Sequence, residues 1–262
     1  MLAGMHWLLF RIRMRTQVAF RQQLARVVPL DFKAAELFLH ADSITDLGRA
    51  HACSKEPATV AWITERIKSG DVLYDIGANV GAYSLVAAYC GGVKSRIYAF
   101  EPSFLNFHQL CRNVILNKFQ GNILPYMIAL SEKTGVSRFN YASLEPGAAL
   151  HALGEAVNSQ GESFEPIYGQ QMISFCLDDL IEQFAFPCPN LVKMDVDGIE
   201  PSILAGADKT LGDLRLRSVI VEICDHRGQQ AEIVVRMERH GFRLTGTVPH
   251  KHDGIADLLF DR

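Results

Sequence analysis

The chain has 262 residues, of which 48% are hydrophobic and 21% are charged, and its formal net charge is −3. This length suits one large α/β domain with an extension, and the ordinary composition excludes collagen-like and low-complexity chains. The slightly negative charge argues against general nucleic-acid binding, which usually needs a basic face, and the sequence has no run of ~18 apolar residues that could cross a membrane.

Residues 1–55 are predicted to form an extension that is mixed but largely helical. Its start is basic, because five arginines precede the first acidic residue: Arg11, Arg13, Arg15, Arg21 and Arg26. The apolar stretch WLLF comes before these arginines, whereas a signal peptide carries its positive charge first. We favour an arm that packs on the domain and exposes its arginines to water. The alternative is a basic amphipathic helix in weak contact with an anionic membrane surface.

Strands and helices alternate from residue 56 onward. The hydrophobic pattern predicts strands at 72–76, 96–100, 191–195 and 218–223 and another at the end of 122–130, with helices such as 57–68 and 81–91 around them. This alternation is typical of a Rossmann-like α/β fold with a doubly wound, mostly parallel sheet. The tail, residues 241–261, resembles two strands and a turn, so we expect an antiparallel C-terminal edge. The predicted main domain therefore covers residues 56–262.

The segment 131–170 does not fit this alternation. It is rich in Gly, Ser, Pro and Asn. A connection of this length inside a compact domain is usually functional or disordered. We interpret it as a short strand followed by a mobile lid or substrate loop over the site.

A polar, glycine-rich turn with the sequence DIGANVG follows the first core strand, at residues 75–81. Ligands bind at the carboxyl ends of the strands in a doubly wound sheet, so this turn is a candidate site. Gly77 allows a sharp turn, and Gly81 allows the backbone to approach a ligand at the start of the next helix. The turn is not a dinucleotide fingerprint, because Asn79 stands where a glycine makes room for pyrophosphate. Asp75 would also repel a phosphate and favour a cation.

Glu101 ends the next strand. An acidic residue roughly 20 positions after the glycine turn typically binds the two hydroxyls of a ribose. A ligand with a ribose, a positive centre and no pyrophosphate fits both groups, and S-adenosylmethionine has these features. The structural alternative is a tight β–α turn in which Glu101 merely caps a helix.

Four blocks of the sequence resemble, in order and spacing, the FkbM family of S-adenosylmethionine-dependent methyltransferases. They are EPATVAWITERIKSGDVLYDIGANVGAYSL, IYAFEPSFLNFHQLCRNVILN, MIALSEKTG and LVKMDVDGIEPSILAGADKTL, and the resemblance extends over about residues 56–222. It implies a class I methyltransferase fold and methyl transfer to oxygen, commonly to a hydroxyl of a saccharide, a polyketide or another small natural product.

The resemblance also implies a set of cofactor-binding residues. The methionine end of the cofactor would be held by Asp75, Gly77, Ala78, Asn79 and Gly81. Glu101 and Pro102 would hold the ribose, and the region of Ala129 would line the adenine. The sequence departs from the family in the block DVDGIE, where Asp197 replaces the usual Glu and keeps its charge on a shorter side chain.

Methyl transfer from a sulfonium requires mainly that the protein align the acceptor and remove its proton. Asp195 ends the fourth strand and is expected to face the sulfonium end of the cofactor. His226 follows the fifth strand, and histidine suits proton removal near neutral pH. Our hypothesis is that His226 or Asp195 is the general base and that Asp195 also orients the cofactor. In the structural alternative, His226 caps a helix and Glu222 pairs with Lys193.

We do not expect a metal in this site. Asp195, Asp197 and Glu222 offer the oxygen ligands that Mg²⁺ prefers, and a magnesium site there is the less favoured alternative. His250 and His252 have a spacing that a metal could use, but they lie in an expected hairpin turn and are interpreted as surface residues.

Other functions compete for the same sheet. Asn79 and Asp75 argue against a NAD-dependent oxidoreductase, and the intact turn, Glu101 and Asp195 argue against a binding protein that has lost its chemistry. RNA methylation would need a basic face, for which only the arginine-rich start is a candidate. Six scattered cysteines without a C-x-x-C pair indicate reduced thiols and a cytoplasmic location.

Overall fold

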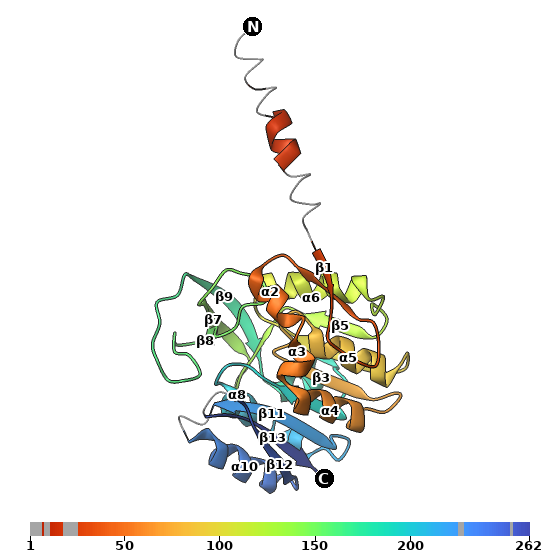
Figure 1. Cartoon of the computed structure of the whole chain (residues 1–262). Coiled ribbons are helices and arrows are strands. Elements are labelled where there is room, and N and C mark those ends of the chain that lie inside the picture. The colour runs from red at the N-terminus through yellow and green to blue at the C-terminus, as the bar shows by residue number, and fades with distance from the viewer. Residues whose placement is uncertain (1–6, 8–10, 18–25, 225–227, 252–253) are drawn as a thin grey trace.

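The computed structural model describes residues 7, 11–17, 26–224, 228–251 and 254–262. Within these ranges, seven strands form the central sheet in the order β12-β13-β11-β10-β3-β4-β5 (Figure 1). They are β3 (Val72–Ile76), β4 (Arg96–Phe100), β5 (Ile123–Tyr126), β10 (Leu191–Met194), β11 (Ser218–Cys224), β12 (Arg243–Pro249) and β13 (Ile255–Asp261). Neighbours from β11 to β5 are parallel, and β13 is antiparallel to β11 and β12. The predicted doubly wound sheet with an antiparallel C-terminal edge is confirmed.

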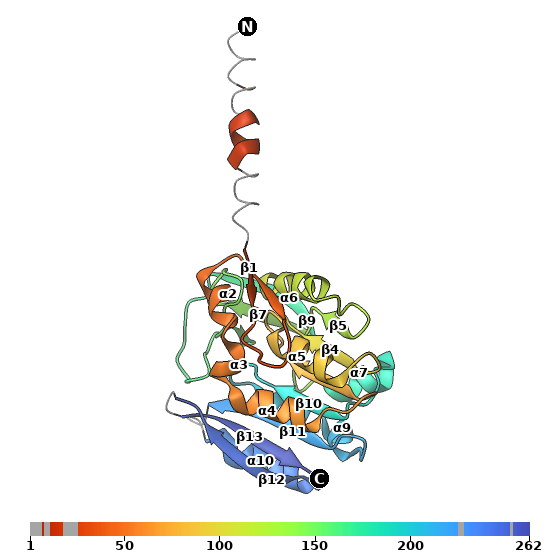
Figure 2. The ribbon, with the colours of Figure 1, turned by 45° about the vertical axis from the view of Figure 1, so that its right-hand side comes forward.

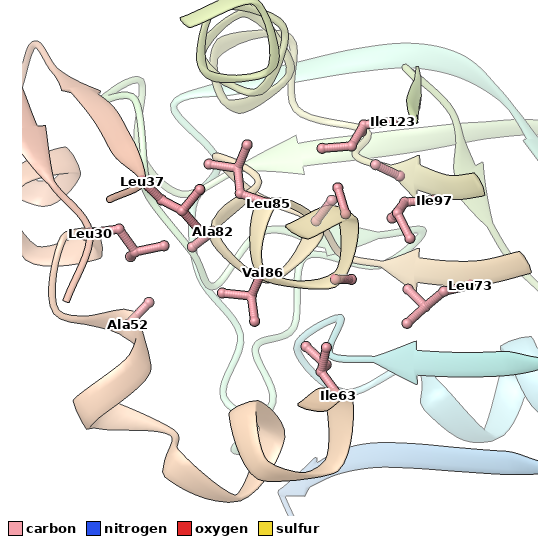
Figure 3. Close-up of a cluster of buried hydrophobic side chains, with 14 of the residues drawn as sticks. Leu30, Leu37, Ala52, Ile63, Leu73, Ala82, Leu85, Val86, Ile97 and Ile123 are labelled. Carbon is pink, nitrogen blue, oxygen red and sulfur yellow. The ribbon is translucent and has the colours of Figure 1, made fainter. Parts of the chain in front are cut away.

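Helices cover both faces of this sheet (Figure 2). One core contains side chains of α4 (Pro57–Arg66), α5 (Ala82–Gly91) and α6 (Phe104–Leu116), and the other contains side chains of α7 (Leu177–Phe184), α8 (Glu200–Ala205), α9 (Asp208–Gly212) and α10 (Gln229–Arg239). Successive residues of a strand point to opposite faces, so Leu73 belongs to the first core and Tyr74 to the second. Figure 3 shows the first core, where Leu85 and Val86 of α5 lie over the sheet residues Leu73 and Ile97.

Residues 26–55 contain a hairpin that the sequence analysis did not predict. β1 (Arg26–Pro29) pairs antiparallel with β2 (Phe38–Ala41), and the short helices α2 (Ile44–Arg49) and α3 (Ala52–Lys55) follow. The hairpin is fixed to α6, because the backbone N–H groups of Phe38 and His40 donate to the side chains of Asn117 and Asn113. The expectation of a largely helical extension was therefore wrong for this part.

Residues 11–17 are helical, and their side chains are exposed. This stretch carries three of the arginines that we expected on an arm packed against the domain. The exposed arginines agree with that expectation, whereas the exposed side chains of Ile12 and Met14 show that this described part of the arm does not pack on the domain. Among the described residues, no helix is both long enough and apolar enough to span a membrane.

The segment 131–170 contributes strands to a second, smaller sheet, and the connections between these strands are irregular. β6 (Ala129–Leu130), β9 (Tyr168–Phe175), β7 (Gly135–Tyr141) and β8 (Ala152–Leu153) lie side by side in that order. β7 and β9 pair antiparallel along seven residues of β7, and the stretch between β7 and β8 lies over the main sheet's site. The predicted short strand is thus β7, and the expected strand near 122–130 is divided between β5 and β6.

Candidate active site

A cavity of about 250 Å³ lies at the carboxyl ends of the parallel strands. It opens where the strand order reverses, since β4 and β5 lie to one side of β3 while β10 and β11 lie to the other. Ligands of doubly wound sheets bind at such a reversal. Seven of the residues expected to bind the cofactor line the cavity: Gly77, Ala78, Asn79, Glu101, Pro102, Ala129 and Asp195.

The turn after β3 is fixed to both neighbouring strands. The backbone N–H groups of Gly77 and Ala78 donate to the carbonyl oxygen of Phe100, each at 3.0 Å. Gly77 has a φ of +77°, and a Cβ added there would lie 1.8 Å from the backbone oxygen of Asp195. Glycine is therefore required at this position by the close approach of β10 as well as by the left-handed backbone.

Gly81 and Asp75 lie behind the turn and are not among the residues that line the cavity. Gly81 has a φ of +87° at the start of α5, and a Cβ there would lie 2.5 Å from Leu110 of α6. Asp75 is buried, accepts a hydrogen bond from Ser84 Oγ and lies 3.4 Å from Lys193 Nζ. Both residues support the turn from below the cavity floor.

Glu101 joins the end of β4 to this turn. Its Oε2 accepts a hydrogen bond from the backbone of Asn79 at 2.7 Å, and its Oε1 accepts one from the backbone of Ser103 at 2.9 Å. Burial raises the pKa of Glu101 to about 7, although the two backbone N–H groups act in the opposite direction. A carboxylate oxygen has two acceptor positions, so each oxygen of Glu101 keeps one for a donor in the cavity.

Three carboxyl groups meet on the other side of the cavity. Oxygens of Glu56, Asp195 and Glu222 lie within 4.8 Å of one another, so the cluster contains Glu56 instead of the expected Asp197. Lys193 Nζ lies 3.6 Å from Asp195. Burial would lower the pKa of Lys193, but Asp75 and Asp195 raise it above its ordinary value. The ammonium therefore stays charged and neutralises part of the cluster.

The environment of this cluster keeps protons bound. Burial, followed by the charges of Asp195 and Glu56, raises the pKa of Glu222 well above its ordinary value. Burial and the charge of Asp195 also raise the pKa of Asp197 to about 6. Asp197 lines the cavity and accepts a hydrogen bond from the backbone of Leu150, between β7 and β8.

His250 is not the surface residue that the sequence suggested. Its Nδ1 lies 3.5 Å from Glu222, and its Nε2 lies 3.0 Å from the buried Asp257. The hairpin of β12 and β13 thus places a histidine behind the acidic cluster, and Glu222, His250 and Asp257 form a second group whose composition would suit a metal. The other two predicted histidines, His226 and His252, lie outside the described residues.

Comparison with known protein families identifies the family of this chain. The Methyltransferase FkbM domain matches residues 75–244, which is more than half of the chain. The protein belongs to the FkbM methyltransferase family. The matched region starts at the glycine turn and includes Glu101, Asp195 and Glu222.

Two similar proteins are methyltransferases by their names. The chain is 28% identical over 196 residues to hexuronic acid methyltransferase AglP of Haloferax volcanii, covering 74% of this chain and 72% of that protein. It is also 28% identical over 198 residues to 31-O-demethyl-FK506 methyltransferase FkbM of Streptomyces tacrolimicus, covering 68% of this chain and 75% of that protein.

A solved structure supports the fold. The FkbM methyltransferase of Methylobacillus flagellatus superposes with a TM-score of 0.52 at 13% identity, over 83% of this chain and 65% of that chain. This chain thus spans just under two thirds of that protein. The comparison confirms the class I methyltransferase fold. Membership of the FkbM family identifies the protein as an S-adenosylmethionine-dependent methyltransferase.

Sequence reasoning missed three residues that the fold brings to the site. Glu56 precedes α4, His250 directly follows β12, and Arg49 ends α2. Glu56 and Arg49 line the cavity, and His250 contacts it through Glu222. Glu56 and Arg49 lie outside the glycine turn and the strand ends that the motifs mark, so no local spacing pointed to them, while the spacing of His250 and His252 did not reveal that His250 lies against Glu222.

Proposed function

We propose that this protein transfers a methyl group from S-adenosylmethionine to an oxygen atom of a saccharide or another small-molecule acceptor. The observation that carries the proposal is Glu101, whose carboxyl group is held by the glycine turn and still faces the cavity. A carboxylate at the end of the second strand of such a sheet suits ribose hydroxyls.

The lining groups fit this cofactor. Besides Glu101, the cavity presents Oε2 of Glu200, which is buried and has no hydrogen-bond partner in the described chain, and the carboxylate of Asp195. These groups accept hydrogen bonds or attract cations. S-adenosylmethionine brings hydroxyl and amino donors, an ammonium and a sulfonium, whereas a pyrophosphate would meet the same carboxylates with repulsion.

The rest of the lining suits an aromatic base. Between Glu101 and Glu200 the cavity is lined by apolar side chains: Phe100, Ile128, Leu130, Ile199 and Ile203. We infer that these side chains line the adenine together with the region of Ala129. Pockets of this kind, apolar with a few convergent polar groups, are typical of cofactor sites.

The acidic cluster suits removal of the acceptor's proton. The cofactor would supply a methyl group that is already activated by its positively charged sulfur. Burial and neighbouring charge raise the pKa of Glu222, so this member of the cluster holds its proton more tightly than an exposed glutamate does. We infer that Asp195 is the general base, since its carboxylate lines the cavity and lies 3.6 Å from the ammonium of Lys193. His226, the other candidate base, stays a prediction.

The acceptor side of the cavity is formed by two segments outside the common sheet. The extension contributes residues of α2 and α3, and the adjacent stretch between β7 and β8, which α2 contacts at Gly147, contributes residues 148–151. The two relatives are named for a hexuronic acid and for 31-O-demethyl-FK506, so we propose that these segments determine which small hydroxylated or acidic acceptor binds.

Calorimetric titration tests the cofactor. We expect S-adenosylmethionine and S-adenosylhomocysteine to bind with micromolar affinity, which is about −8 kcal/mol, and NAD to give no heat. Glu101→Gln should weaken both adenosyl ligands at least about 10-fold, because a charge-assisted pair of hydrogen bonds is lost. The control is Glu238→Gln on the exposed side of α10, which should bind like the wild type.

Two outcomes would contradict the proposal. Absence of adenosyl binding to the wild type would remove the cofactor assignment. Equal affinity of Glu101→Gln and Glu238→Gln would mean that Glu101 only stabilises the turn.

A further inference from the structure

Three cationic side chains line the cavity, and two of them are neutralised within the chain. Lys193 lies between Asp75 and Asp195, at 3.4 and 3.6 Å. Lys55 lies 3.2 Å from Glu56. The third is Arg49, and none of the described carboxylates comes within 4.0 Å of its guanidinium.

The guanidinium of Arg49 is anchored at one end and open at the other. Its Nε donates to the carbonyl oxygen of Gly147 at 2.9 Å, while its two terminal nitrogens donate to no described atom. The residue ends α2 and is half-buried, so the side chain lies where the extension meets the stretch between β7 and β8. Its charge acts on His151 and Asp197, which line the same cavity.

Three arginines outside the cavity are arranged differently. The partly buried guanidinium groups of Arg66, Arg217 and Arg236 each lie within 3.1 Å of an aspartate oxygen. A partly desolvated charge normally finds such a partner within the fold, because leaving it unpaired is costly. Arg49 is oriented by a single backbone carbonyl, which leaves its fork of N–H donors free for a partner from outside.

We propose that Arg49 binds a carboxylate group of a small molecule in the cavity through its two terminal nitrogens. A planar guanidinium matches a carboxylate in a two-point arrangement that an ammonium cannot reproduce. The other side of the cavity is acidic, with Glu56, Asp195 and Glu222 clustered there, so an acid in this cavity needs a local cation. Among the described lining residues, Arg49 is the cation that remains available for it.

Two molecules could bring this carboxylate. One is the cofactor, whose methionine end carries an α-carboxylate, and this case rests on the proposed function. The other is an acidic acceptor such as a uronic acid. In both cases one carboxylate binds one guanidinium. Binding measurements can distinguish the cofactor from the acceptor as the source of the carboxylate, and they do not require enzymatic turnover.

The first arm compares two thioether ligands by calorimetry. S-adenosylhomocysteine carries the α-carboxylate, whereas its decarboxylated form keeps the adenosine and the ammonium. If the cofactor is the source, Arg49→Gln should weaken S-adenosylhomocysteine at least about 10-fold and leave the decarboxylated form unchanged. Arg49→Lys should restore only part of the affinity, and Arg236→Gln on α10 is the matched control that should change neither ligand.

The second arm titrates D-glucuronate and D-glucose into protein saturated with S-adenosylhomocysteine. If an acidic acceptor is the source, the wild type should bind glucuronate more tightly than glucose, and Arg49→Gln should lose that preference while binding S-adenosylhomocysteine normally. The inference is overturned if Arg49→Gln matches the wild type for both acids. If the wild-type protein binds neither adenosyl ligand, the proposed function is refuted but the inference about Arg49 is not. The glucuronate titration, made without nucleoside, would then test Arg49 by itself.

Discussion

At the scale of single residues, the site depends on one glycine more than on any catalytic group. Gly77 lies where β3 turns under the cavity, and its missing side chain lets the backbone of Asp195 approach. The same contact brings the general base proposed here next to the turn that would hold the cofactor. Gly77 therefore matters both for the packing of the fold and for the chemistry of the site, and a substitution of this residue should affect both.

Gly77→Ala should destabilise the protein strongly. The left-handed backbone alone costs roughly 1–2 kcal/mol for a residue with a Cβ. Gly241 has a similar φ of +83° with nothing within 4 Å of an added Cβ, so Gly241→Ala should lose about that much. Gly77→Ala must also move β10, and we expect a loss of at least about 3 kcal/mol in urea unfolding. Equal losses in the two variants would show that the turn relaxes freely.

At the scale of elements, side chains of the main domain fasten the stretch between β7 and β8 over the cavity. Asn79 and Asn106 both donate to the carbonyl oxygen of Ala148, at 3.1 and 3.0 Å. Asn106 also accepts from the backbone of Gly147 at 2.8 Å, and Ser43 donates to Pro146. The extension, the glycine turn and α6 thus meet on a few residues of one connection. This arrangement gives the expected lid a fixed attachment.

Asn106→Ala should loosen that attachment. The change removes two hydrogen bonds and leaves the N–H of Gly147 without a partner, at a cost of about 1–3 kcal/mol. We expect faster hydrogen exchange of the amides in 142–151, measured by mass spectrometry, with little change in the central sheet. The matched control is Asn122→Ala, which removes bonds to Gly92 and Ser95 away from the cavity and should leave 142–151 unchanged. Unchanged exchange in Asn106→Ala would mean that other contacts hold the stretch.

At the scale of the whole molecule, the cavity gathers buried acids whose pKa values are raised. Burial raises the pKa of Glu200 and of Glu101 from 4.5 to about 7, and burial with the charge of Asp195 raises the pKa of Asp197 from 3.8 to about 6. The folded protein therefore binds more protons than the unfolded chain between these values. Stability from these groups is fully present below the unfolded pKa values and is lost as the pH rises through the folded ones.

The free energy of unfolding should accordingly fall as the pH rises from 4.5 to about 7. Each such group contributes a slope of up to about 1.4 kcal/mol per pH unit. Glu200→Gln cannot ionise and keeps an oxygen for the backbone N–H groups of Val196 and Gly198, so its stability should fall less over this range. Urea unfolding at intervals across the range measures the difference, with Glu238→Gln as the exposed control. A slope in Glu200→Gln equal to the wild-type slope would refute the assignment.

The sequence by itself determined the sheet, the glycine turn, Glu101 and Asp195, because hydrophobic periodicity and strand ends are local properties of the chain. The free state of all six cysteines agrees with the expectation of reduced thiols. Only the tertiary structure decided that Glu56 replaces Asp197 in the acidic cluster, that His250 lies behind Glu222, and that Arg49 faces the cavity. Arg49 comes from the extension, Glu56 from the start of α4 and His250 from the C-terminal hairpin. Long-range packing fixes the positions of these segments, and such contacts leave no periodic signal in the sequence.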